Sequence, residues 1–296
     1  MNVLVLGATG YIGWPTVQAL SRAGHIAYGL VRQESQAQKL RASEIIPVIG
    51  DASDPSTWVS IIRSLDVIID CTGGPEVERL SNALFDAITT AAKDRPSTVP
   101  KLTYIYSSGA SVHGDNRVDL VSETSILGTP AALFAWRQEF ERRVVGSDIV
   151  SGIVIRPGLP HGYNGGITAY WFKMAESGKV VWYGKPGGRT GFVHVDDLAD
   201  LYVRVTEGAS LVGGRIFDAA NDQTEGVDDL FERMFDAVGV KGEVTYLEPS
   251  NILEAVMSTT ILMRPYLAKK LLGWQPKKVG LGDGMKLYYD AWKSSQ

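Results

Sequence analysis

Cysteines, histidines and long apolar runs are scarce in this 296-residue sequence. The single cysteine, Cys71, excludes an internal disulfide framework and is typical of a reducing compartment. The four histidines, His25, His113, His161 and His194, lie too far apart to form a metal-binding motif. No apolar run approaches the roughly 20 residues of a membrane span, and the N-terminus shows no signal-peptide pattern. We therefore expect a soluble cytoplasmic protein with no metal and no membrane partner.

Charge of one sign is also lacking. The formal net charge is −4 and the isoelectric point is about 5.6, with no basic patch that contains interleaved aromatic residues. This composition gives no electrostatic reason to expect a nucleic-acid partner. A hydrophobic content of 45% is enough to bury a large core, and the length allows one large domain or two modest ones.

The most informative stretch is the N-terminal MNVLVLGATGYIG. Its apolar run, residues 3–6, has the pattern of a strand buried on both faces of a parallel sheet, and Gly7, Gly10 and Gly13 follow directly. Helical spacing of apolar residues predicts a helix from near Tyr11 to Gly24. The N-terminus of such a helix carries about half a positive charge and suits a pyrophosphate, provided that no side chains block the turn.

GATGYIG resembles the fingerprint of the extended and atypical short-chain dehydrogenase/reductases, which include epimerase/dehydratase-like proteins. The alternative is three turn glycines at the start of a helix, and the position directly after an N-terminal strand favours the dinucleotide site. At the end of the second apolar run, where NAD-specific folds carry an acidic residue, this sequence has Arg32. A guanidinium suits the 2′-phosphate of NADP, so we expect NADP (NADPH) rather than NAD, the alternative for Arg32 being a solvated surface arginine.

Apolar runs and helical segments alternate along the chain. The runs at 26–31, 45–49, 67–71, 102–106 and 149–155 predict further strands, and a final strand is expected at 215–221. Helices are expected at 33–40, after Asp54, at 76–92, 129–145, 167–176 and 198–205, and a loop at 158–166. This order specifies an α/β fold with a doubly wound parallel (Rossmann) sheet. We expect the nucleotide-binding domain to span 1–158, rejoined at about 191–221, and a smaller substrate region to span 159–190 and 222–296.

Four further segments carry the resemblance: Thr72-Gly73-Gly74, the SSxxxVYG-like residues 107–114, the FVHVDDxA-like residues 192–199, and residues 271–276. Arg156-Pro157-Gly158 follows the strand expected at 149–155. The resemblance also implies that Asp51 lies beside the adenine ring, although an Asx turn would explain it equally. Together these observations predict the following cofactor contacts: Gly7, Thr9, Gly10, Tyr11, Ile12, Gly13, Arg32, Asp51, Ala52, Thr72, Gly73, Gly74, Ser107, Gln138, Arg156, Pro157 and Gly158.

Two other positions have both a chemical and a structural interpretation. Asp196 and Asp197 could act as paired carboxylates, but residues that open a helix are favoured as caps and dipole partners. Cys71 follows a buried strand and has no nearby histidine, which indicates a small apolar residue rather than a nucleophile.

The resemblance implies a serine, a tyrosine and a lysine for carbonyl chemistry, and this chain departs from it at all three. Aligning residues 112–114 with the VYG segment places Gly109, Phe134 and Gln138 at these positions. Phenylalanine has no proton to transfer and glutamine carries no charge to lower a neighbouring pKa. Ser108, His113 and Tyr163 are the remaining candidates for proton donors, with a structural role as the alternative for His113.

The leading hypothesis is an NADP-binding atypical short-chain dehydrogenase/reductase that acts on a small organic carbonyl, imine or alkene with a non-standard proton donor. One alternative is an inactive regulator that senses NADP(H) and reports to a protein partner. Another is a non-redox isomerase or cyclase on the same fold. Analogy with the family also suggests a homodimer formed through the helices at 76–92 and 129–145.

Overall fold

A computed structural model describes the backbone of residues 1–296 and every side chain except those of Leu133, Ile252, Leu253 and Val256. The chain divides into two compact units. Unit 1 comprises Met1–Ser108, Arg137–Ile155 and Leu198–Ile216, and unit 2 comprises Gly109–Trp136, Arg156–Asp197 and Phe217–Gln296. The assignment of nucleotide binding to one region and substrate binding to the other stays a prediction.

A seven-stranded sheet has the order β12-β7-β5-β4-β1-β2-β3. The pairs from β7 through β3 are parallel, and the crossovers between them are helical, which confirms the predicted doubly wound fold. The strands are β1 (Asn2–Leu6), β2 (Ile26–Val31), β3 (Ile46–Ile49), β4 (Val67–Asp70), β5 (Thr103–Ser107), β7 (Ser151–Pro157) and β12 (Ile216–Ala219).

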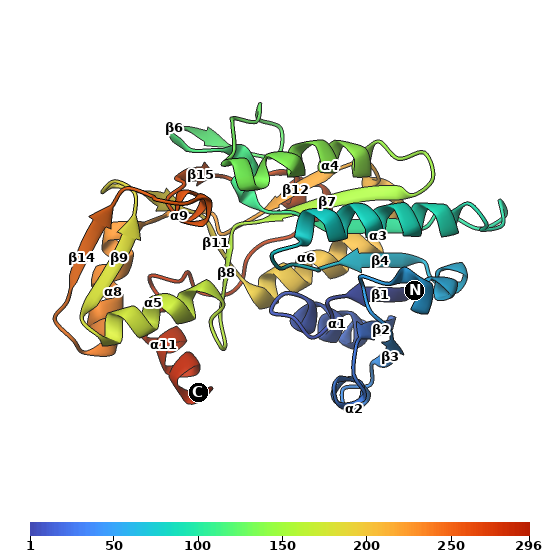
Figure 1. Cartoon of the computed structure of the whole chain (residues 1–296), viewed down its shortest axis with the longest axis horizontal. Coiled ribbons are helices and arrows are strands. Elements are labelled where there is room, and N and C mark those ends of the chain that lie inside the picture. The colour runs from blue at the N-terminus through green and yellow to red at the C-terminus, as the bar shows by residue number, and fades with distance from the viewer. The chain divides into compact units, whose positions relative to one another are not determined.

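Helices cover both faces of this sheet, with α1 and α6 on one face and α3 and α4 on the other (Figure 1). The sheet is covered on both faces because the central strands β1 and β4 are continuously apolar, so side chains on both faces must be buried. Val3 to Leu6 and Ile68 to Ile69 are 0% exposed. On the second face Arg143 of α4 contacts Asn82 and Asp86 of α3. The helices are α1 (Gly13–Arg22), α2 (Glu34–Arg41), α3 (Val77–Ala92), α4 (Ala135–Val145), α6 (Val195–Glu207) and α7 (Ala209–Val212).

Two predicted helices differ from the structure. The segment after Asp54 forms two 3₁₀ helices, η1 (Pro55–Thr57) and η2 (Val59–Ser64), because the backbone leaves the helical range at Trp58, where φ is −140°. The helix predicted from residue 129 begins only at Ala135, after a 3₁₀ turn η4 (Ala132–Phe134). Thr129 precedes a proline, which disfavours helical backbone at that position.

Unit 2 is built from short strands and helices. Its strands are β6 (Asn116–Val121), β8 (Leu159–His161), β9 (Lys179–Tyr183), β10 (Arg189–Thr190), β11 (Phe192–His194), β13 (Glu225–Gly226), β14 (Glu243–Leu247) and β15 (Ile261–Met263). Its helices are η3 (Ala110–His113), η4, α5 (Ile167–Glu176), α8 (Val227–Val238), α9 (Ile252–Met257), α10 (Leu267–Leu272) and α11 (Met285–Ser294). The helix predicted at 167–176 is confirmed, whereas the predicted loop at 158–166 contains β8, which pairs in parallel with β11.

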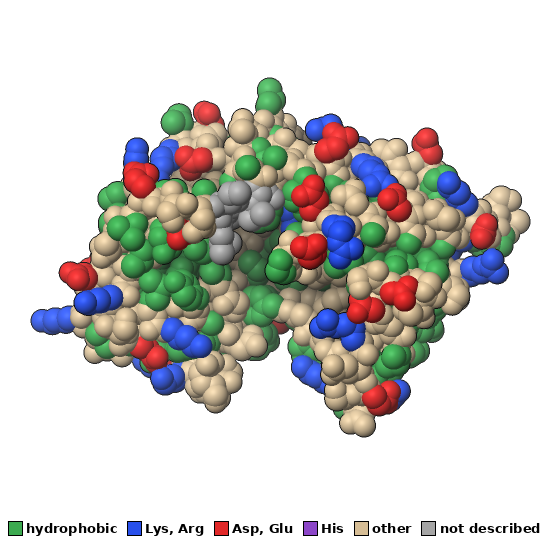
Figure 2. Space-filling view, in the orientation of Figure 1, with side chains coloured by type: hydrophobic (Ala, Val, Ile, Leu, Met, Phe, Trp, Pro, Cys, Tyr) green, Lys and Arg blue, Asp and Glu red, His purple; other side chains and the backbone are tan. Residues whose placement is uncertain are grey.

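The main core of unit 2 is aromatic. Trp171, Phe172, Trp182, Phe231 and Trp292 are buried together, between helices α5, α8 and α11 and strand β9. On the surface shown in Figure 2, basic and acidic side chains are interspersed, in agreement with the small net charge. Within the described part of the chain, no helix is long and apolar enough to cross a membrane.

Candidate functional site

The turn between β1 and α1 is closed by its own backbone. The amide of Gly10 donates to the carbonyl of Gly7 at 2.9 Å, and the amide of Trp14 donates to the carbonyl of Gly10 at 2.9 Å. Gly7 has a φ of +73°, and a β-carbon there would lie 2.7 Å from the carbonyl oxygen of Cys71. A β-carbon at Gly13 would lie 2.1 Å from the Gly7 carbonyl oxygen. Glycine is therefore required at positions 7 and 13 by the packing of the turn.

Gly10 differs from the other two glycines. A β-carbon at position 10 would meet only the Gly7 carbonyl oxygen, at 3.1 Å, and the residue is exposed. The missing side chain leaves room beside a helix N-terminus, which is the arrangement that admits a pyrophosphate. The residues present therefore fit a dinucleotide.

A cleft of about 430 Å³ lies beside this turn within unit 1. The chain segments that line it come from the carboxyl ends of β1, β2, β3 and β4 and from the first turn of α3. This is where ligands bind in open α/β sheets. Its lining residues are Gly7, Thr9, Gly10, Leu30, Val31, Arg32, Gln36, Gly50, Asp51, Ala52, Ser53, Cys71, Thr72, Gly73, Glu76, Arg79 and Leu80. Eight of the predicted contacts are in this set: Gly7, Thr9, Gly10, Arg32, Asp51, Ala52, Thr72 and Gly73. Cys71, which the sequence indicates to be a small apolar residue, also lines the cleft.

Arg32 is exposed at the rim of the cleft, and its guanidinium makes no hydrogen bond or ion pair with the part of the chain that is described. Its backbone amide donates to Oε1 of Gln36 at 3.3 Å, and Nε2 of Gln36 donates to Oγ1 of Thr9 at 3.5 Å. Gln36 thus connects the end of β2 with the glycine turn. The sequence interpretation missed this residue, although its place one turn into α2 was a usable signal.

Asp51 forms an Asx turn. Its Oδ1 accepts hydrogen bonds from the Ser53 amide at 2.8 Å and the Ser53 hydroxyl at 2.7 Å. These hydrogen bonds lower the pKa of the Asp51 carboxyl below its usual range, with a smaller contribution from the positive charge of Arg32. The indole of Trp58 donates to the Asp51 carbonyl at 3.0 Å and closes the loop. The carboxylate is ionised and held by its own turn.

A second missed residue, Asp70, fixes the turn after β4. Its Oδ1 accepts from the amide of Thr72 at 2.9 Å and from the Thr72 hydroxyl at 2.6 Å, while Oδ2 accepts from the hydroxyl of Tyr104 at 2.7 Å. Asp70 is 1% exposed. Burial, together with the negative charge of Asp70, raises the pKa of Tyr104 well above its usual range, so this hydroxyl stays a donor. The Thr72-Gly73 turn therefore has a fixed shape on one wall of the cleft.

Ser107 ends β5 inside unit 1. Its hydroxyl lies 2.6 Å from the hydroxyl of Tyr202 and 3.4 Å from the sulfur of Cys71. Burial raises the pKa of the Cys71 thiol to about 12, so the thiol is protonated at neutral pH and is a poor nucleophile. Arg137 donates to the Tyr106 hydroxyl at 2.7 Å and to the Ser107 carbonyl at 3.4 Å.

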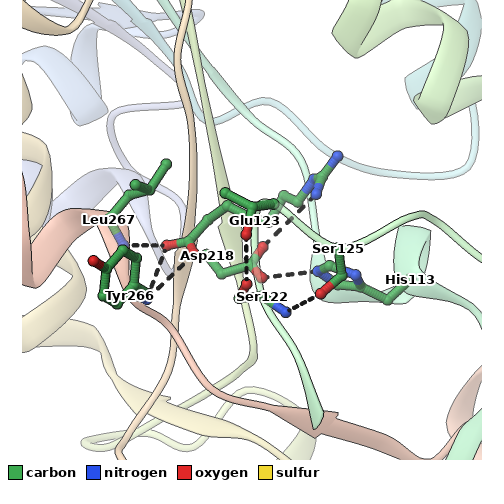
Figure 3. Close-up of polar contacts among 9 residues, drawn as sticks. His113, Ser122, Glu123, Ser125, Asp218, Tyr266 and Leu267 are labelled. Atoms are coloured by element: carbon green, nitrogen blue, oxygen red, sulfur yellow. Dashed lines mark hydrogen bonds and ion pairs between the residues drawn. The ribbon is translucent and has the colours of Figure 1, made fainter. Parts of the chain in front are cut away.

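The candidate proton donors lie in different surroundings. Ser108 follows β5, and its buried hydroxyl has no hydrogen-bond partner among the described residues. His113 is inside unit 2, where Nε2 lies 2.8 Å from Oδ2 of Asp218, and Nη1 of Arg156 lies 3.9 Å from Oδ1 of the same carboxylate (Figure 3). The exposed Tyr163 has a φ of +50°, and its hydroxyl donates to Oδ2 of Asp196 at 2.7 Å.

Figure 3 also shows Glu123 beside Asp218. Its carboxylate accepts from the amides of Tyr266 and Leu267, at 3.2 and 3.0 Å, and so binds the start of α10. Burial, and then the negative charge of Asp218, raises the pKa of Glu123. Arg156, predicted to touch the cofactor, is thus one member of a buried charged group inside unit 2.

Asp196 and Asp197 both lie in the first turn of α6, where acidic residues are stabilised by the helix dipole. Their side chains make different contacts. Asp196 also lies 3.0 Å from Nζ of Lys278, and the buried Asp197 accepts from the amides of Lys277 and Lys278 at 2.9 and 3.0 Å. Asp197 therefore anchors the C-terminal segment of unit 2.

The remaining predicted positions are spread over the chain. Tyr11 and Ile12 precede α1, Gly74 has a φ of +115°, and Pro157 ends β7. Gly158 donates to the carbonyl of Ala219 at 2.8 Å, and a β-carbon there would lie 2.4 Å from the Gly191 carbonyl oxygen. Gly109 is extended with φ −172° before η3, Phe134 ends η4, and Gln138 lies in α4. No group of three potential metal ligands occurs among the described residues.

Comparisons with known proteins agree with this geometry. A model of the family described as "NAD dependent epimerase/dehydratase family" matches residues 3–220. Phenylcoumaran benzylic ether reductase IRL1 of Ginkgo biloba is 22% identical over 275 residues, or 87% of this chain and 82% of that protein. An uncharacterized protein of Schizosaccharomyces pombe is 32% identical over 120 residues, or 38% of this chain and only 41% of that protein. The structure of dTDP-glucose 4,6-dehydratase from Bacillus anthracis, in complex with NAD, has a TM-score of 0.81 at 15% identity, with 99% of this chain and 97% of that chain covered.

Proposed function

The chain belongs to the NAD dependent epimerase/dehydratase family, and from this premise we propose that it is an NADP-binding oxidoreductase for a small organic carbonyl, imine or alkene. The observation that carries the proposal is the cleft of unit 1, where a side-chain-free turn at Gly10 and an arginine at the end of β2 line the same space. The relatives that are reductases, and the related structure that holds NAD, support the reaction class.

In this proposal each wall of the cleft has a role in binding. The glycine turn takes the pyrophosphate against the N-terminus of α1, and the Asp70-fixed turn at Thr72 and Gly73 borders its path. Arg32 binds the 2′-phosphate, since its guanidinium is exposed and the carboxylate of Asp51, which lines the same cleft, is held by Ser53. The bound dinucleotide supplies or accepts a hydride at its nicotinamide.

Proton transfer is assigned to groups other than a tyrosine–lysine pair, because Phe134 and Gln138 stand at those positions. The hydroxyl of Ser108 is the proposed donor of a hydrogen bond to a substrate oxygen, since it is unpaired among the described residues. The hydroxyl of Tyr163 is the second proposed donor, and it must exchange its hydrogen bond to Asp196 for one to the substrate, because a phenol has a single proton to donate.

The substituted triad favours a second function, that of a catalytically inactive protein that senses NADP(H). The two functions share the cofactor and differ in turnover.

Calorimetry with NADPH and NADH tests the cofactor binding that the two functions share, and we expect NADPH to bind more tightly. Arg32→Glu should reverse this preference by repelling the 2′-phosphate. Equal affinity of the wild type for the two cofactors would contradict the NADP assignment.

Oxidation of NADPH in the presence of aldehydes, ketones, imines and activated alkenes tests the reductase proposal. We expect the absorbance of NADPH to fall with at least one substrate class of the panel. In Ser108→Ala or Tyr163→Phe the rate of this fall should be lower. Tight binding of NADPH with no turnover on any substrate would favour the sensor.

A further inference from the structure

A second arginine lines the cofactor cleft. Arg79 lies in the first turn of α3, a 16-residue helix that begins at Val77 without a side-chain cap hydrogen bond. Arg32 reaches the same cleft from the end of β2, so two guanidinium groups from separate elements border one space of about 430 Å³. Neither the sequence pattern nor the proposed function has given Arg79 a role.

Arg79 is paired with Glu76, the residue immediately before its helix. Its Nε lies 3.2 Å from Oε2 of Glu76, and the side chains are 66% and 72% exposed. An exposed ion pair three residues apart in a helix changes an equilibrium by only about twofold. The pair can therefore be exchanged for a stronger partner at little cost.

The charges of the cleft show what that partner must be. The lining residues include two guanidinium groups, those of Arg32 and Arg79, and two carboxylates, those of Asp51 and Glu76. The Asp51 carboxylate already accepts two hydrogen bonds from Ser53. Glu76 is therefore the carboxylate that forms an ion pair with an arginine of the cleft, Arg79. A dianionic phosphate carries twice the charge of a carboxylate and can accept two parallel hydrogen bonds from a guanidinium, whereas Glu76 accepts one from Arg79.

We propose that Arg79 is a second specificity-determining residue for the 2′-phosphate of adenosine and that Glu76 masks its guanidinium when the cleft holds no phosphate. This inference rests on the proposed cofactor function. Binding of the phosphate transfers Arg79 from Glu76 to the ligand, so Glu76 weakens the affinity for a 2′-phosphorylated ligand, and Arg79 increases it.

The test uses two fragments that differ by a single group. 5′-AMP and adenosine 2′,5′-bisphosphate are titrated calorimetrically into the wild type and into Arg79→Ala, Arg79→Gln and Glu76→Gln. Arg63→Ala is the matched control, because Arg63 is 73% exposed, lies 3.8 Å from Asp94 and is not part of the cleft lining. Thermal unfolding of each variant shows that it is folded, and Arg79→Gln replaces Arg79→Ala if the alanine variant is not.

We expect the wild type to bind the bisphosphate at least tenfold more tightly than AMP. Arg79→Ala should reduce this ratio about tenfold with AMP affinity nearly unchanged, Glu76→Gln should raise it two- to fivefold, and Arg63→Ala should leave it unaltered. An unchanged ratio in both Arg79 variants would overturn the inference, and so would a lower ratio in Glu76→Gln. A wild type that binds AMP and the bisphosphate equally would instead contradict the NADP assignment, and one that binds neither would contradict the cofactor function itself.

Discussion

The Nε2 nitrogen of His113 lies 2.8 Å from Oδ2 of Asp218, and neither side chain has exposed surface. The contact joins η3, which lies within the SSxxxVYG-like segment, to strand β12. Its two residues are 105 positions apart in the chain. Because Arg156 faces the other oxygen of Asp218, this carboxylate is the shared partner of two buried basic side chains.

Asp218→Ala should therefore destabilise the protein strongly. The substitution leaves His113 and Arg156 buried without their carboxylate, and removal of one partner of a buried pair costs roughly 3–5 kcal/mol. Urea unfolding at pH 7 measures the change. Asp119→Ala, at an exposed position in β6, is the control and should stay within about 0.5 kcal/mol of the wild type. Equal stabilities of the two variants would show that the buried group contributes nothing.

Two of the three glycines of the β1–α1 turn, Gly10 and Gly13, should respond differently to substitution. Gly10→Val should fold normally and weaken NADPH binding at least tenfold, about 1.4 kcal/mol, because its side chain enters the pyrophosphate path. Gly13→Ala should lower the free energy of unfolding by about 1–3 kcal/mol, since its β-carbon would lie 2.1 Å from a backbone oxygen. Calorimetry and urea unfolding separate the effects, and unchanged affinity in folded Gly10→Val would reduce GATGYIG to a simple turn.

His161 should make the protein less stable in mild acid. Burial, and then the positive charge of His194 when protonated, lowers the pKa of His161 from 6.5 to about 3. The unfolded chain then binds a proton near pH 6.5 that the folded chain rejects down to about pH 3. Stability from this group is full above pH 6.5 and falls as the pH decreases, by about 1.4 kcal/mol per unit.

At pH 5 this loss amounts to about 2 kcal/mol for His161 alone. His161→Leu, similar in volume, should lose about 2 kcal/mol less than the wild type does between pH 7.5 and pH 5 in urea unfolding. The comparison at pH 7.5 controls for any packing change, because the wild-type ring is neutral there. Parallel pH profiles of the two proteins would mean that His161 is not held neutral in the folded state.

The sheet was predictable because its signal is local. The apolar runs that form β1, β2 and β4 are continuous in sequence, and each is followed by a turn or a helix within a few residues. In unit 2 the same reasoning found α5 but missed β8, β9 and β14. β8 has only three residues, and β14 pairs with β9 across more than 60 positions, so no local pattern reveals the pairing.

The candidate site divides in the same way. The glycine turn and Arg32 could be identified from position alone, whereas the roles of Asp70 and Gln36 depend on hydrogen bonds that form only in the folded chain. Asp218 carries no sequence signal, because its partners come from η3 and β7. Arg79 was visible as the first basic residue after the Thr72-Gly73-Gly74 turn, but only the cleft lining relates it to Arg32.

The last prediction concerns the three substituted positions, where Gly109→Ser, Phe134→Tyr and Gln138→Lys would together restore the residues that the family resemblance implies. We expect little or no gain in NADPH oxidation with simple aldehydes and ketones. Phe134 ends the 3₁₀ turn η4 and Gln138 lies in α4, which begins at Ala135, so the two positions do not share one regular helix from start to end. Single substitutions should fail as well, because groups that act as a unit are not additive. A wild type as active as an ordinary carbonyl reductase, with most activity lost in Phe134→Ala, would mean that the alignment of these residues is wrong. An inactive wild type beside an active triple variant would favour the sensor, in which catalysis is lost and the scaffold is kept.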